Sequence, residues 1–131
     1  MCPDRILIVD DSAEFLGLLS RDVLPQFGYE TVPASSGREA LRLLDEEKLD
    51  LVLLDVQLPD ISGLEVLQEL QRQQPKIPVV VMTAYGSESI AVEAFRLGAK
   101  DYLIKPFDTN LALATIERQL EQSRLQREKE R

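Results

Sequence analysis

Apolar runs alternate with amphipathic stretches along the whole chain. The three clearest runs are continuous and cover residues 5–11, 50–55 and 77–84. A strand that is apolar at every position is buried on both faces, as in a parallel sheet covered by helices. Two weaker strands are predicted at 29–35, where Pro33 suggests an edge strand or a strand end, and at 101–106.

Between these runs, apolar residues recur at the three- and four-residue spacing of a helix that is buried on one side. The predicted helices cover residues 11–24, 36–48, 62–74, 87–99 and 108–131. Ser12 is a candidate N-cap, Pro75 stops the third helix and Gly98 ends the fourth. Five strand–helix units with short connections predict one α/β domain, although periodicity does not give the strand order.

Polar residues stand where the predicted strands end. They are Asp10 and Asp11, Asp55, Thr83, and Lys105. The carboxyl ends of parallel strands lie on one edge of the sheet, and ligands bind there where the strand order reverses. Three carboxylates, a hydroxyl and an ammonium are therefore expected to converge. Taken singly, Asp11 is also explained as a helix N-cap, Thr83 as a turn residue and Lys105 as a surface charge.

Three converging carboxylates repel one another, and a divalent cation relieves the repulsion. Oxygen ligands without histidine or thiolate indicate Mg²⁺ or Mn²⁺. A cation and Lys105 next to a carboxylate also suit a phosphoryl group, with Asp55 as the nucleophile that forms an aspartyl phosphate. The cation and Lys105 would neutralise charge on the transferring oxygens, and Thr83 would donate a hydrogen bond to one of them.

Composition narrows the functions further. The 131 residues are 44% hydrophobic and 29% charged, which is typical of a globular domain. A net charge of −8 argues against a nucleic-acid surface. The chain has no histidine, so any phosphohistidine must belong to a partner. The single Cys2, the lack of a signal peptide and the lack of a membrane-length apolar run indicate a cytoplasmic protein.

Four stretches carry a family resemblance: "ILIVDD", "DLVLLDVQLPDISGLEVL", "VVVMTAYG" and "GAKDYLIKPFD". In order and spacing they resemble the receiver domain of bacterial two-component response regulators, over residues 5–108. The resemblance implies a flavodoxin-like (βα)5 fold with a five-stranded parallel sheet in the order 2-1-3-4-5.

The resemblance also implies residue roles. Asp55 matches the phosphoacceptor. Asp10 and Asp11 match the acidic pair that holds Mg²⁺, with Asp11 as the direct ligand and Asp10 acting through water. The backbone carbonyl of Gln57 matches a further ligand. Gln57 and Tyr85 lie where members of the family vary and where the residues tune the rate of dephosphorylation. The lifetime of the phosphorylated state is therefore expected to be specific to this chain.

Three other positions match the machinery of the switch. Thr83 matches the hydroxyl that turns toward the phosphoryl group, and Tyr102 matches the aromatic residue that swings inward with it. Without the resemblance, Tyr102 would be interpreted as a core residue. Lys105 matches the lysine that pairs with the phosphate, and the Lys105–Pro106 bond matches one that is cis in the family.

The resemblance divides the chain into a receiver core, residues 1–108, and a last helix that extends as a charged linker, residues 109–131. Leu113, Ile116 and Leu120 form an apolar seam that fades at Ser123. An output domain is expected after residue 131, and a sensor histidine kinase or histidine phosphotransfer protein is the expected donor. A short coiled coil and a homodimer remain open.

Two other classes of function compete with the signalling module. A Mg²⁺-dependent phosphatase could also use an aspartyl phosphate, but such enzymes usually carry both acids as Asp-x-Asp at the end of one strand. This chain has adjacent acids and no cap domain. A binding module with a dead site is the third class, and the intact set of acids with Lys105 argues against it.

Overall fold

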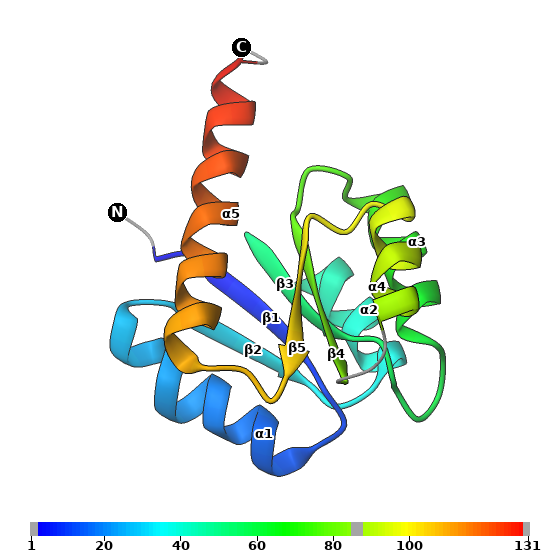
Figure 1. The fold of residues 1–131 in the computed structure, drawn as a ribbon. Coiled ribbons are helices and arrows are strands. Elements are labelled where there is room, and N and C mark those ends of the chain that lie inside the picture. Colours follow the sequence, from blue (N-terminus) through cyan, green and yellow to red (C-terminus); the bar gives the residue numbers. More distant parts are fainter. Residues whose placement is uncertain (1–2, 85–87, 130–131) are drawn as a thin grey trace.

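The computed structural model describes residues 3–84 and 88–129, which form a five-stranded sheet between two layers of helices (Figure 1). The strands are β1 (Arg5–Val9), β2 (Glu30–Ala34), β3 (Leu51–Asp55), β4 (Val79–Ala84) and β5 (Asp101–Lys105). Neighbouring strands pair in parallel in the order β2-β1-β3-β4-β5. The predicted flavodoxin-like fold is therefore confirmed, and Pro33 lies in an edge strand. Cys2 and Tyr85 lie outside the described residues.

The helices are α1 (Ala13–Gly17), α2 (Gly37–Glu46), α3 (Gly63–Gln73), α4 (Glu88–Arg96) and α5 (Thr109–Lys129). The prediction of one regular helix over 11–24 was wrong. After Gly17 the chain forms a π-helical segment, Leu18–Val23, and a 3-10 helix, Leu24–Phe27. Pro25, in the first turn of the 3-10 helix, lacks the backbone N–H that would let an α-helix continue past it. Gly28 ends the segment with a φ of 88°.

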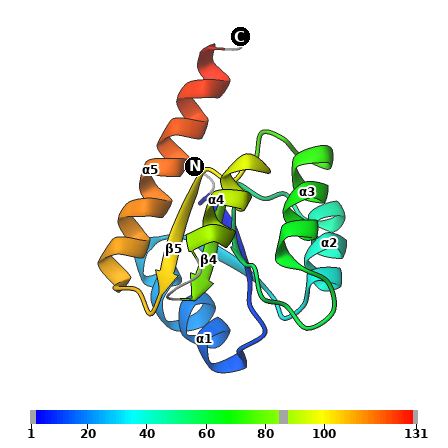
Figure 2. The same cartoon turned by 45° about the vertical axis from the view of Figure 1, so that its right-hand side comes forward.

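Alternate residues of the central strands face opposite layers, so both faces of the sheet are buried. One layer consists of α1 and α5, and the other consists of α2, α3 and α4 (Figure 2). Ile6, Ile8, Leu53 and Met82 pack with Leu16 and Ile116 on the first side, whereas Leu7, Val9, Leu54 and Val81 pack with Leu44 and Leu67 on the second. This arrangement explains the continuous apolar runs in the sequence.

The last helix packs on the sheet only over its first half. Ile116 and Leu120 are buried and Leu113 is partly buried, whereas Leu125 is half exposed. The distal part of α5 projects beyond the sheet in Figure 1. The apolar seam and its fading are therefore confirmed. None of the helices within residues 3–84 and 88–129 is both long and apolar enough to cross a membrane.

Candidate functional site

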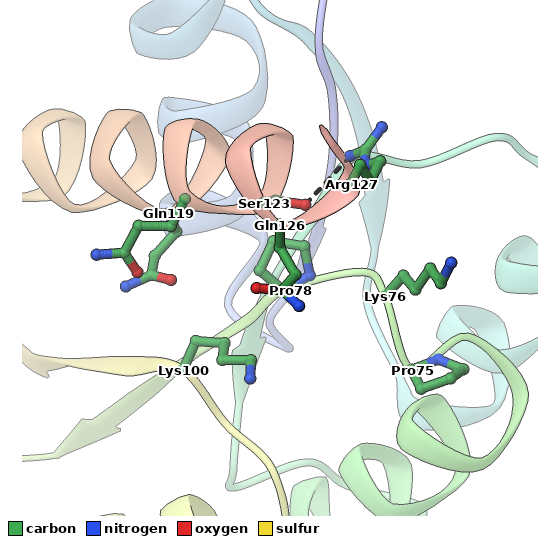
Figure 3. Close-up of a pocket in the computed structure, with 9 residues that line it drawn as sticks. Pro75, Lys76, Pro78, Lys100, Gln119, Ser123, Gln126 and Arg127 are labelled. Atoms are coloured by element: carbon green, nitrogen blue, oxygen red, sulfur yellow. Dashed lines mark hydrogen bonds between the residues drawn. The ribbon is translucent and has the colours of Figure 1, made fainter. Parts of the chain in front are cut away.

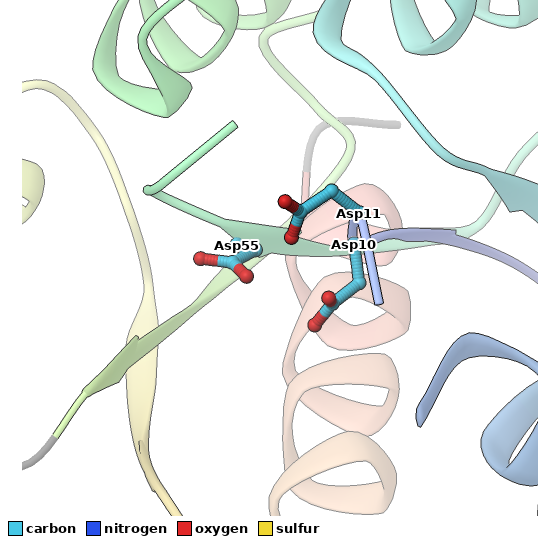
Figure 4. A group of neighbouring side chains, drawn as sticks. All are labelled: Asp10, Asp11 and Asp55. Atoms are coloured by element: carbon cyan, nitrogen blue, oxygen red, sulfur yellow. The ribbon is translucent and has the colours of Figure 1, made fainter. Parts of the chain in front are cut away.

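Three carboxylates meet at the carboxyl end of the sheet (Figure 4). Asp10 and Asp11 follow β1, and Asp55 is the last residue of β3, the neighbouring strand. One oxygen from each lies within 4.8 Å of the others. Asp10 is fully buried, Asp55 is 7% exposed and Asp11 is exposed. The predicted convergence of the three acids is confirmed.

Backbone N–H groups hold the two buried carboxylates. Asp10 Oδ1 accepts a hydrogen bond from Ser12 N at 2.9 Å, and Asp55 Oδ1 accepts one from Gln57 N at 2.8 Å. Ser12 in turn caps α1 by accepting from Phe15 N, which confirms the predicted cap. Asp11 is therefore not the cap of this helix, and its exposed carboxylate stands free of that local role.

Lys105 joins the two buried carboxylates from the end of β5. Its ammonium donates to Asp10 Oδ2 and, at 3.0 Å, to Asp55 Oδ2. Its side chain is 26% exposed. The interpretation of Lys105 as a solvated surface charge is thus wrong, because the lysine is built into the cluster. The Lys105–Pro106 peptide bond is cis, as the resemblance implied.

The surroundings of Asp55 and Lys105 shift the pKa of both residues upward. Burial raises the pKa of Asp55 and outweighs the lowering by the Gln57 N–H and by Lys105; the charge of Asp10 adds to the rise. Burial alone would lower the pKa of Lys105, but its hydrogen bonds to Asp10 and Asp55 and their charges raise it instead. The site therefore favours charge on the lysine and disfavours it on the Asp55 carboxylate.

The acidic cluster fits a hard divalent cation. Its three carboxylates carry three negative charges when ionised, and Lys105 supplies one positive charge. The donors are oxygens, which suit Mg²⁺ and Mn²⁺ better than zinc or copper. Their mutual distances of at most 4.8 Å allow all three to face one ion. Asp10, Asp11 and Asp55 are the residues that could hold it.

Thr83 and Tyr102 occupy different surroundings. Thr83 is 1% exposed in β4, where it pairs in register with Ile104, the residue before Lys105. Tyr102 lies three residues before Lys105 and is 38% exposed. Its ring meets Phe95 of α4 edge-to-face, with centroids 5.6 Å apart. Tyr102 is therefore not a core residue, because its side chain is partly exposed and packs against α4.

The loop between β3 and α3 is fixed at several points. Gly63 N donates to Val56 O at 3.0 Å, and a Cβ on Gly63 would stand 2.4 Å from the Val56 Cα, so only glycine fits there. Asp60 accepts hydrogen bonds from Gly37 N and Arg38 N, both 2.9 Å, at the start of α2. The loop that carries Gln57 is thereby tied to a neighbouring helix as well as to Asp55.

A cavity of about 410 Å³ lies at the opposite end of the sheet (Figure 3). It is lined by residues of the segment before β4, by Lys100 and by the distal half of α5, including Ser123 and Arg127. None of the acids of the carboxylate cluster borders it. We do not take this cavity as the candidate site, because the acids and Lys105 converge at the other end of the sheet.

Two kinds of contact could not be found from the sequence. The ring of Phe15 lies under the Lys105 ammonium, but in the sequence Phe15 only fits the apolar spacing of a helix and does not indicate this contact. Asp60 stands in a stretch with proline, serine and glycine, which is typical of any turn. Both roles depend on residues 22 to 90 positions away along the chain.

Comparison with known families gives one clear match. The sequence model of the family described as response regulator receiver domain matches residues 6–117. These residues include all three acids of the cluster, Thr83, Tyr102 and Lys105.

Individual relatives agree with this match. The transcriptional regulatory protein ZraR of Escherichia coli (strain K12) is 44% identical over 115 residues, which cover 88% of this chain and 26% of ZraR. The chemotaxis protein CheY of Thermotoga maritima is 34% identical, over 86% of this chain and 93% of CheY. A crystal structure of NtrX from Brucella abortus has a TM-score of 0.92 at 36% identity, over 96% of this chain and 29% of NtrX. The chain thus spans about a quarter of the length of ZraR.

Proposed function

This chain belongs to the response regulator receiver domains, and on that premise we propose which of its residues carry the phosphoryl chemistry. The role of the family is to accept a phosphoryl group within a two-component system, and this is the function of the domain. The observation that supports the residue assignment is the cluster of Asp10, Asp11 and Asp55 with Lys105 bonded to two of them.

Asp55 is the proposed acceptor. Its Oδ2 attacks the phosphorus of a partner's phosphohistidine, the P–N bond breaks, the imidazole leaves, and an Asp55 O–P bond forms. Asp55 ends a buried strand, and its Oδ1 is held by Gln57 N, so the nucleophile is oriented before the donor arrives. Lys105, already 3.0 Å from Oδ2, stands next to the oxygen that forms the new bond, where its ammonium can neutralise negative charge on the transferring phosphoryl oxygens.

Asp10, Asp11 and the backbone carbonyl of Gln57 are the proposed metal ligands besides Asp55. Bound Mg²⁺, or Mn²⁺, supplies positive charge for the transferring phosphoryl oxygens. The cluster supports this assignment because its charge is otherwise unbalanced. Asp11 is exposed and Asp10 is buried, which fits a direct role for Asp11 and a role through water for Asp10.

Thr83 and Tyr102 are the proposed switch. Thr83 is buried one register position from Lys105 and can donate its hydroxyl to a phosphoryl oxygen. Tyr102, which is partly exposed and packs against Phe95, is the side chain proposed to move inward. A shift of both residues would change the surface of α4, β5 and α5 and favour one of two populated conformations.

The wider role follows the same proposal. A sensor histidine kinase or a histidine phosphotransfer protein donates the phosphoryl group in the cytoplasm, and the chain catalyses nothing beyond its own phosphorylation and dephosphorylation. The core comprises residues 1–108, and 109–131 leads as a helical linker to an output domain. The short coverage of ZraR and NtrX supports an output domain. A homodimer is compatible with the exposed α4–β5–α5 surface, and direct nucleic-acid contact by this domain is not proposed.

Intact-protein mass spectrometry after incubation with acetyl phosphate tests the proposal. The parent chain should gain one labile phosphoryl adduct with Mg²⁺ and none with a chelator. Asp55→Asn should gain none under either condition. An equal adduct on Asp55→Asn would contradict the assignment of the acceptor, whereas steady turnover of small phosphate esters would favour the phosphatase.

A further inference from the structure

Phe15 in α1 lies against the lysine of the carboxylate cluster. The Lys105 Nζ atom stands over its ring, 4.5 Å from the centroid. At this distance the negative face of an aromatic ring attracts a cation. The Phe15 ring also meets Phe107 edge-to-face, with centroids 5.6 Å apart and planes at 81°. Phe15 thus contacts both the lysine and a residue two positions after it.

From this geometry we propose that Phe15 is a positioning residue that holds the Lys105 ammonium at the reaction site, with Phe107 fixing the orientation of the ring. The inference rests on the proposed function, because it concerns the lysine assigned there to the phosphoryl group. Phe15 does not touch the reacting atoms in this arrangement; it acts through Lys105.

The other contacts of Lys105 explain why the ring matters. Its two anionic partners, Asp10 and Asp55, are also the residues proposed to hold the cation and to receive the phosphoryl group. Their hold on the ammonium weakens when they serve those roles. An aromatic face is uncharged and is no ligand for a hard cation, so it does not compete for either role. The contact with Phe15 therefore remains during the reaction.

The position of the ring favours a lasting contact. Lysine has a flexible four-carbon stem, and freezing it in one place costs conformational entropy. Phe15 is partly buried against the apolar cluster that contains Leu16 and Ile116. Phe107, partly buried in the same cluster, packs on its edge. A ring held from two sides gives the ammonium a fixed surface next to Asp55.

A purely structural role for Phe15 makes a different prediction. If only apolar bulk is needed, leucine should replace phenylalanine without loss in the reaction rate. If the ring face is needed, tyrosine should replace it and leucine should not. Phe15→Leu and Phe15→Tyr therefore separate the two roles.

The first experiment measures the rate of adduct formation with Mg²⁺ over a range of acetyl phosphate concentrations. Phe15→Leu should lower the maximal rate about fivefold with little change in the half-saturating concentration, as loss of a partly desolvated cation–π contact implies. Phe15→Tyr should stay within about twofold of the parent. Phe27→Leu is the matched control, since Phe27 is 57% exposed at the end of its 3-10 helix. A parental rate in Phe15→Leu, or an equal loss in Phe15→Tyr, would overturn the proposal.

The second experiment does not depend on phosphorylation. A double-mutant cycle combines Phe15→Leu with Lys105→Met and measures the unfolding equilibrium constant of all four proteins. The joint effect should differ from the product of the single effects by about two- to fivefold. An additive cycle would show that the ring does not hold the lysine. Absence of any adduct on the parent would instead count against the proposed function, and the cycle would still decide the contact.

Discussion

The two ends of the sheet use the same kinds of charged residue in different ways. At the end opposite the carboxylate cluster, Arg5 pairs with Glu30 and Glu47 at 3.2 and 2.8 Å, and its backbone N–H donates to Asp50. These side chains are about one-third to one-half exposed. At the carboxyl end, three acids lie together, and one lysine pairs with the two that are buried.

This difference suggests that the ion pairs of Arg5 have a structural role, whereas the carboxylate cluster is suited to binding a cation. Water solvates and screens partly exposed ion pairs, so these pairs contribute little to reactivity or to stability. A buried cluster with more acids than bases is not solvated in this way, so it is stabilised by an added cation or by loss of negative charge. The comparison predicts that equivalent changes at the two ends have different effects, and four measurements test it.

The largest expected effect is on the reaction rate of Lys105→Met. Removing the ammonium next to Asp55 Oδ2 should slow adduct formation by about 10²-fold, the usual effect of losing one charge-stabilising donor. Arg5→Met makes the same cation-to-methionine change at the other end and should stay within about twofold of the parent. Equal loss in both variants would show that the effect is on folding and is not local.

Addition of Mg²⁺ should stabilise the parent chain. At a concentration ten times its Kd, binding to the folded state alone adds about 1.4 kcal/mol to the free energy of unfolding. Thermal unfolding with and without the ion measures this gain. Asp11→Asn should lose most of it, whereas Asp50→Asn, at the opposite end of the sheet, should keep it. Retention of the full gain in Asp11→Asn would remove Asp11 from the metal site.

The ion pairs of Arg5 should contribute modestly to stability. Arg5→Met is expected to lower the free energy of unfolding by about 1 kcal/mol or less, because its partners are partly exposed and solvent screens them. Urea unfolding measures the change, and raised salt should narrow it. A loss of several kcal/mol in the free energy of unfolding would contradict the description of the Arg5 ion pairs as weak, solvent-screened contacts.

The smallest effect concerns the charge of Asp55. Burial raises the pKa of Asp55, so folding disfavours its ionised form. The corresponding stability is present below its ordinary pKa of 3.8 and is lost as the pH rises through the folded value. Without Mg²⁺ at pH 7, Asp55→Asn should therefore be slightly more stable than the parent, by less than the gain from Mg²⁺. This difference in the free energy of unfolding, measured by urea unfolding, should shrink as the pH falls toward 3.8. A variant that is less stable than the parent at pH 7 would contradict the expected sign.

Much of the fold follows from residue patterns. Continuous apolar runs predict strands buried on both faces, and the helical spacing of Leu64, Leu67 and Leu70 predicts α3. The carboxylate cluster could also be predicted, because Asp10, Asp11 and Asp55 stand at the carboxyl ends of strands that run in parallel. Strand order was available only from the family resemblance, since periodicity along the chain does not say which strands are neighbours.

Other features depend on contacts between distant residues. The change from α-helix to π-helix after Gly17 was not predicted, because the apolar spacing continues through Val23. Tyr102 and Lys105 have the same local pattern of strand residues, yet one is half exposed and the other lies in a buried cluster. The ring of Phe15 over Lys105 depends on packing between α1 and the end of β5.

The most direct test of the account locates the phosphoryl group. Borohydride reduction converts an aspartyl phosphate to homoserine, and mass spectrometry of the resulting peptides identifies the modified position. The account predicts homoserine at Asp55 alone, only after incubation with acetyl phosphate and Mg²⁺. Homoserine at Asp10, Asp11 or an acid outside the cluster would contradict it.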